Sequence, residues 1–118
     1  MKDNPVQEKS FAFALRIVKL YKYLGEDKTE YVLSKAVLTS GTHIGKHVKE
    51  ASSGESRQVF ISEMATALKK ASETEYWLEL LRAADYLDEK AFASINGDCQ
   101  ELMRLLTSIV KTSKQTAE

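Results

Sequence analysis

After Pro5 the chain contains no further proline, and long runs of its sequence repeat apolar residues at steps of three and four positions. Proline and glycine are the residues that most often interrupt helices, and this chain has one proline and five glycines among 118 residues. The most regular run, with steps of 3-4-3-4-3, comprises Phe92, Ile95, Cys99, Leu102, Leu106 and Ile109. Such spacing places one apolar face along an α-helix. The sequence therefore predicts an all-α protein.

Four helices are predicted, over residues 6–24, 29–52, 57–85 and 88–112. Gly25 is placed to end the first helix, and Asp27 with Glu30 resembles a capping box that starts the second. Short connections between long amphipathic helices favour antiparallel neighbours. We therefore expect one domain over residues 1–118, folded as an antiparallel up-down-up-down four-helix bundle.

The first predicted helix carries two apolar stripes rather than one. The first contains Phe13, Ile17, Leu20 and Leu24, and the second contains Phe11, Ala14, Leu15, Val18 and Tyr21. So wide an apolar arc indicates that the helix contacts more than one neighbour. In the third helix, Tyr76 and Trp77 are adjacent and point to different sides, so one can face the core and the other a subunit neighbour or solvent, and both are oligomer-contact candidates. Together these features predict a homo-oligomer.

The segment SGTHIGKHVKEA places Gly41 and Gly45 inside the second predicted helix, although an interior glycine costs about 1 kcal/mol relative to alanine. On a helical wheel, Ser40 and Ile44 belong to the apolar face, and the two glycines lie on a flank of small residues. Such a flank lets a second backbone come close. We predict a helix-packing contact through these four residues, within the bundle or between subunits. The alternative is a close approach of the backbone to a ligand.

His43 and His47 are four residues apart, the spacing at which one helix can offer two ligands to a metal ion. The pair lacks the H-E-x-x-H form, and Glu50 is the nearest further ligand in the sequence. We expect a pair that faces solvent or another subunit, and no cofactor. A metal site at the two histidines is the alternative.

Several classes of function find no support in the sequence. The chain has 17 basic and 17 acidic residues, so no strong overall field attracts nucleic acid or membranes, although residues 1–50 are mildly basic and residues 51–100 acidic. There is no nucleophile-elbow motif and no phosphate-binding glycine loop, and Cys99 lies on an apolar seam. The first ten residues do not resemble a signal peptide, and no apolar run is long enough to span a membrane. We expect a cytoplasmic protein that is not an enzyme.

Two short segments in the middle of the chain have distinctive sequences: Ser-Gly-Thr-x-Ile-Gly at 40–45 and Glu-Thr-x-Tyr-Trp-Leu at 73–78. With Glu50, Ala51, Ser56 and Phe60 between them, these residues resemble the central block of the four-helix bundle family named for the 23S ribosomal RNA intervening sequence. The resemblance implies a small helical bundle that forms rings, often of five subunits. It also implies kinship with accessory proteins of diversity-generating retroelements, in which a basic surface meets nucleic acid. This chain has Thr39 where a basic residue is common in the family.

Taken together, the sequence predicts a non-enzymatic interaction or scaffold module whose partners are further copies of itself and RNA, DNA or a nucleic-acid enzyme. The metal- or small-ligand-binding bundle that uses His43 and His47 is the alternative function. The candidate phosphate contacts are Arg16, Lys19, Lys35, Lys46 and Lys49.

Overall fold

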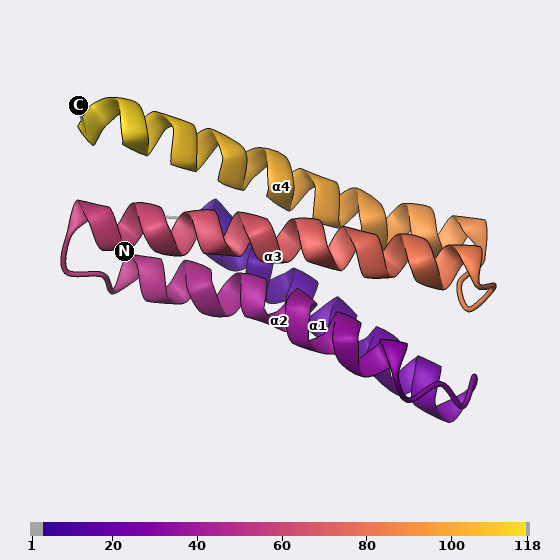
Figure 1. The fold of residues 1–118 in the computed structure, drawn as a ribbon. Helices are drawn as coiled ribbons and strands as arrows, with labels where there is room; N and C mark the ends of the chain where they lie inside the picture. Colours follow the sequence, from indigo (N-terminus) through magenta and orange to yellow (C-terminus); the bar gives the residue numbers. More distant parts are fainter. Residues whose placement is uncertain (1–3, 118) are drawn as a thin grey trace.

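The computed structural model describes residues 4–117, which form four helices. They are α1 (Pro5–Glu26), α2 (Leu33–Ser52), α3 (Arg57–Ala83) and α4 (Glu89–Ala117). Each helix runs antiparallel to the one before it, so the chain passes up, down, up and down (Figure 1). The predicted all-α four-helix bundle is confirmed.

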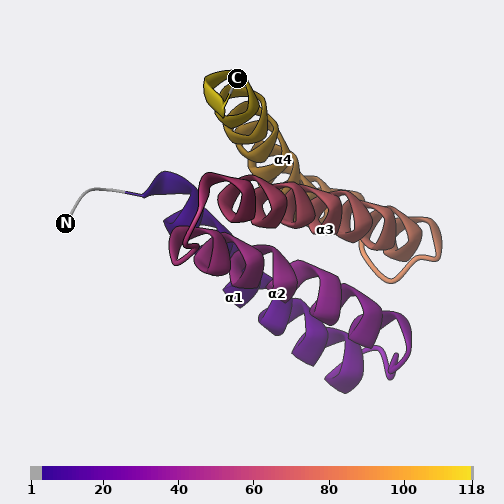
Figure 2. The same cartoon turned by 60° about the vertical axis from the view of Figure 1, so that its left-hand side comes forward.

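The four helices do not pack equally closely. Successive helices pack along much of their lengths, whereas α1 and α4 share few contacts. Figures 1 and 2 show that the C-terminal half of α4 diverges from the other helices. The bundle is therefore elongated, with principal extents of 48 × 24 × 20 Å, and it is closed mainly by contacts between neighbours in the chain.

The core is formed by the apolar faces that the periodicity predicts. The largest fully buried apolar side chains are Phe13, Ile17, Leu24, Val37, Ile44, Val48, Leu78, Leu81, Leu102 and Leu106. One polar pair lies among them: the hydroxyls of Thr74 on α3 and Ser40 on α2 are hydrogen-bonded at 2.9 Å. This bond satisfies two groups that would otherwise be costly to bury. No helix in residues 4–117 is long and apolar enough to cross a membrane.

The start of α2 differs from the prediction. The helix begins at Leu33 rather than at residue 29, and Glu30 precedes it instead of closing a capping box from within. The Glu30 carboxylate accepts hydrogen bonds from the backbone N–H groups of Val32, Leu33 and Ser34 at 3.2, 2.8 and 2.7 Å. A helix start leaves such N–H groups without partners, and a negative charge there is favourable. The acidic side chain thus caps the helix from outside.

The helix ends also differ in detail from the prediction. Gly25 does not stop α1, because the helix continues to Glu26, and the left-handed backbone in the following turn belongs to Thr29, with φ 54°. The end of α3 has a second left-handed residue, Asp85, with φ 69°. The helix α4 continues to Ala117, beyond the predicted end at 112, and residues 113–117 contain no proline or glycine to break it.

Candidate functional site

Gly41 on α2 packs directly against α1. A Cβ atom at Gly41 would lie 2.7 Å from Cγ1 and 2.9 Å from Cγ2 of Ile17, a fully buried side chain of α1. At Gly45 the added atom would lie 3.4 Å from the backbone oxygen of Ser10, which is an ordinary contact. The small-residue flank therefore faces α1 of the same chain, and Gly41 is the position with no room for a side chain.

The second apolar stripe of α1 is only partly covered. Phe11 and Leu15, one helical turn apart, are 67% and 51% exposed, whereas Phe13 and Ile17 on the other stripe are buried. We call Phe11 and Leu15 the outer stripe. The three other helices of the chain leave this stripe largely to solvent, which makes it a candidate contact surface.

A groove of about 670 Å³ runs beside the outer stripe, between the N-terminal half of α1 and the C-terminal half of α2. It is lined by Asn4, Gln7, Glu8, Ser10, Phe11, Ala14, Thr42, Gly45, Lys46 and Lys49. One aromatic ring and two lysines therefore border the same hollow. Sequence reasoning found Lys46 and Lys49 but could not place Phe11 next to them, because they lie on different helices.

A second groove, of about 510 Å³, separates α1 from α4. Arg16 and Lys19 line it together with residues at the beginning of α4. The Arg16 guanidinium is held by α4: Nη1 lies 2.8 Å from the Asp98 carboxylate, and Nη2 donates to the Ser94 hydroxyl at 3.0 Å. Arg16 thus links α1 to α4 through an ion pair and hydrogen bonds, at the helix–helix interface with the fewest contacts.

The structure does not gather the five predicted phosphate contacts into one patch. Lys46 and Lys49 border one groove, Arg16 and Lys19 border the other, and Lys35 is exposed near the beginning of α2. Lys46 is paired with Glu50 at 3.7 Å. Within residues 4–117, Lys19, Lys35 and Lys49 form no ion pair.

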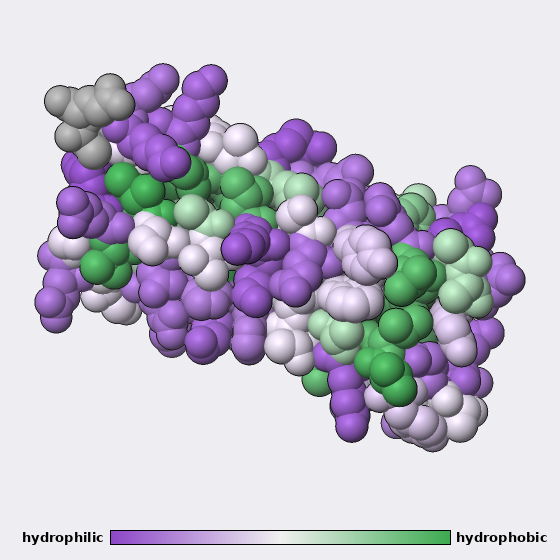
Figure 3. All heavy atoms as spheres, viewed as in Figure 1, coloured by the Kyte–Doolittle hydropathy of each residue, from purple (hydrophilic) through white to green (hydrophobic). Residues whose placement is uncertain are grey.

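Other apolar surface lies on the face drawn in Figure 3, which shows α2, α3 and α4. Apolar side chains gather over the beginning of α3 beside α4, and again over the end of α3 and the beginning of α2 (Figure 3). Val59 at the beginning of α3 and Val32 just before α2 are exposed. Trp77 packs against the core while its neighbour Tyr76 is 57% exposed, with ring centroids 5.1 Å apart. Of these two aromatic side chains, Tyr76 is therefore the one exposed for contact with another molecule.

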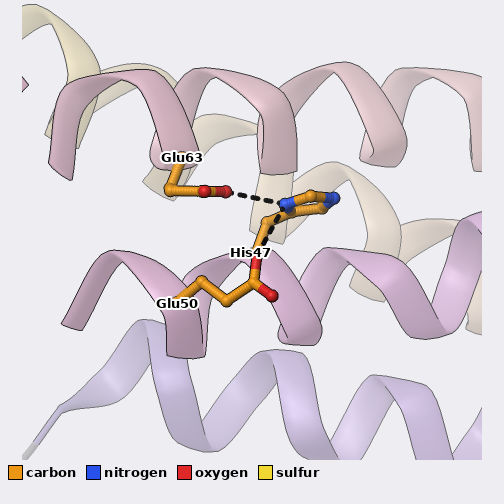
Figure 4. Close-up of side chains that lie close together, drawn as sticks. All are labelled: His47, Glu50 and Glu63. Atoms are coloured by element: carbon orange, nitrogen blue, oxygen red, sulfur yellow. Dashed lines mark hydrogen bonds and ion pairs between the residues drawn. The ribbon is translucent and has the colours of Figure 1, made fainter. Parts of the chain in front are cut away.

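The two histidines have different surroundings. His47 Nδ1 lies 2.8 Å from Glu63 Oε1 on α3 and 3.4 Å from Glu50 Oε1 on α2 (Figure 4). His43 meets His47 edge to face, with ring centroids 6.2 Å apart. Burial lowers the pKa of His43, and the positive charges of Lys46 and Lys70 lower it further. Sequence reasoning missed Glu63, because it is 16 residues away on another helix.

Cys99 lies in the apolar core. Its side chain is fully buried, and its thiol lies 3.3 Å from the backbone oxygen of Ala71. Burial raises the pKa of the Cys99 thiol to about 12, and the nearby charge of Glu75 acts in the same direction. The thiolate, which is the reactive form, is therefore strongly disfavoured.

Comparisons with known proteins agree with this fold. The chain is similar to a crystal structure from Bacteroides thetaiotaomicron, described as a protein of unknown function from the S23 ribosomal protein family. The two share 50% sequence identity with a TM-score of 0.91, over 94% of this chain and 99% of that one. A comparison with curated proteins gives no match. The sequence model of the 23S rRNA-intervening sequence protein family matches residues 2–108, and the chain therefore belongs to that family.

Proposed function

We propose that this chain is a non-enzymatic interaction module that assembles with copies of itself through the outer stripe of α1. The observation that carries the proposal is the exposure of Phe11 and Leu15, one turn apart and beside a groove. Exposed apolar clusters rimmed by polar residues mark contact surfaces on soluble proteins. The family resemblance favours a ring of five subunits.

A ring requires two different contact surfaces on each subunit, because head-to-tail contacts join unlike patches. The outer stripe lies on α1, which is behind α2 and α3 in Figure 1. Figure 3 shows further apolar areas on the front face, which is formed by α2, α3 and α4. More than one apolar surface on a subunit is what a head-to-tail assembly requires.

The assembly is tested by light scattering coupled to size-exclusion chromatography. We expect the wild type to elute at a multiple of 13.3 kDa, with five subunits favoured, and the double variant Phe11→Ser/Leu15→Ser to elute as a helical monomer. Tyr31→Ser is the matched control, since Tyr31 is equally exposed but lies outside the stripe. A monomeric wild type at micromolar concentration would refute self-association. An intact oligomer in the double variant would refute the role of the stripe.

We further propose that the assembly presents its basic groove to RNA, DNA or an enzyme that acts on nucleic acid. Lys46 and Lys49 border the groove next to the outer stripe, and a ring repeats this pair of lysines in every subunit. Lysines along a groove are placed to contact nucleic-acid phosphates. Because phosphate contacts release counterions, the affinity is expected to fall steeply with salt.

Fluorescence anisotropy with a labelled structured RNA tests this second step. Lys46→Glu/Lys49→Glu is expected to abolish binding, whereas Lys90→Glu, on exposed surface of α4, is the control for a general loss of charge. An affinity that is unchanged between low and physiological salt would exclude phosphate contacts as the basis of binding. If the protein does not bind the RNA even at low salt, we expect its partner to be a protein.

A further inference from the structure

The cluster of His47, Glu50 and Glu63 contains more negative charge than one imidazole can satisfy. One ligand atom from each residue lies within 4.8 Å of those of the other two. Both carboxylates approach the same ring atom, Nδ1 of His47, at 2.8 and 3.4 Å. That nitrogen carries at most one hydrogen, so it can donate a linear hydrogen bond to only one of them. The second carboxylate lacks a good partner within the cluster.

From this arrangement we infer that His47, Glu50 and Glu63 bind a divalent transition-metal ion, with Zn²⁺ as the preferred occupant, between α2 and α3. The inference is independent of the proposed assembly. It differs from a site at the histidine pair, because His43 is not a ligand and Glu63 is.

The distances from His47 Nδ1 to the two carboxylate oxygens are close to those between the ligands of a tetrahedral ion. Zn²⁺ binds nitrogen and oxygen at about 2.0–2.2 Å, which sets neighbouring ligands about 3.3–3.5 Å apart at the tetrahedral angle. The observed distances from Nδ1 are 2.8 and 3.4 Å, so small side-chain rotations would admit the ion. Three protein ligands leave the fourth position to water.

The packing of α2 against α3 holds His47 and Glu63 in place, while the Glu50 side chain is 45% exposed. Val48 on α2 and Met64 on α3 follow His47 and Glu63 in the chain and are buried in the core. The His47 side chain is only 16% exposed. The ligands therefore come from rigid elements on both sides of a packed interface, and an ion there would tie α2 to α3.

Charge further selects this histidine rather than its neighbour. The charged side chains that act on His43 are Lys46 and Lys70, which oppose a cation, and Glu50, which favours one. At His47, a divalent ion would instead neutralise two carboxylates. Lys46 pairs with the other oxygen of Glu50, Oε2, at 3.7 Å, so Oε1 remains directed at the site.

The donor set decides the class of ion. An imidazole nitrogen with two carboxylate oxygens suits zinc and its neighbours in the first transition row, whereas magnesium and calcium prefer oxygen ligands alone. We therefore expect binding of Zn²⁺ and of Co²⁺, its spectroscopic substitute, and weak binding of Mg²⁺.

The test is calorimetric titration of the full chain, without a histidine tag and freed of metal, with Zn²⁺. Visible absorption of the Co²⁺ form reports the coordination geometry. We expect His47→Ala and the isosteric Glu63→Gln each to lower the Zn²⁺ affinity at least tenfold, since even partners outside the ligand shell cost about that much. His43→Ala and Glu55→Gln, the latter an exposed glutamate in the turn before α3, should bind as the wild type does.

Three results would overturn the inference. The first is a wild type that does not bind Zn²⁺ at micromolar concentration. The second is Glu63→Gln that binds as tightly as the wild type while circular dichroism shows the same helicity. The third is His43→Ala that loses as much affinity as His47→Ala, which would move the ion to the histidine pair.

Discussion

Replacing Gly41 with alanine is expected to destabilise the protein, although alanine is the better helix former. The gain in helix propensity is about 1 kcal/mol. The added Cβ would lie 2.7 Å from Ile17 Cγ1 and 2.9 Å from Cγ2. Carbon atoms pack best at about 3.5–4.0 Å, so the overlap approaches 1 Å.

Ile17 cannot relieve this overlap without disturbing the core, because its side chain is fully buried. Overpacking of this kind costs about 1–3 kcal/mol, so the net loss at Gly41 is expected to reach up to about 2 kcal/mol. Gly97 on α4 is the control, because a Cβ there meets nothing within 4 Å. Gly97→Ala should therefore stabilise the protein by up to about 1 kcal/mol.

Urea unfolding followed by circular dichroism, at one protein concentration for all variants, measures both changes. Gly41→Leu and Gly45→Leu should each lower the free energy of unfolding further, by roughly 1–3 kcal/mol or more, or break the oligomer. Gly45→Ala should fall between the other two alanine variants, since its Cβ makes an ordinary contact. If Gly41→Ala is as stable as Gly97→Ala, the close packing against Ile17 does not limit this position.

Four further predictions test other parts of the structure. Glu30→Ala removes the carboxylate that caps α2 and should lower the free energy of unfolding in thermal melts by about 0.5–2 kcal/mol; an unchanged melt would contradict the cap. Arg16→Ala should cost less than about 1 kcal/mol in the same assay, because its ion pair is partly exposed, and a larger loss would show that α4 depends on it. The Cys99 thiol should react with a disulfide reagent at pH 8 only after unfolding. Because the pKa of this thiol is raised to about 12 in the folded chain, its contribution to the free energy of unfolding is full below pH 9 and declines from there towards pH 12. Rapid reaction of the folded protein would show that Cys99 is not buried. His43→Ala and His47→Ala should change the metal-free stability little, as read from their melting temperatures.

The sequence determined the features that repeat along a single helix. Apolar spacing predicted four helices and the seam from Phe92 to Ile109, because each helix displays its own periodicity whatever it packs against. The short connections between the helices predicted their antiparallel order. The family resemblance rested on residues 40–78, and the match of the family model to residues 2–108 confirms it. The start of α2 was misplaced, because the periodicity does not reveal that Glu30 caps from outside the helix.

Only the tertiary structure decided which surfaces meet. Both stripes of α1 read as apolar in the sequence, yet Phe13 is buried and Phe11 is exposed. The flank of Gly41 turned out to face Ile17, and His47, which was expected to face solvent or another subunit, turned out to face Glu63 on α3. The physical reason is that a helical wheel fixes angles about one axis, whereas a contact between helices also depends on how each helix is rotated against its neighbour and where the two cross.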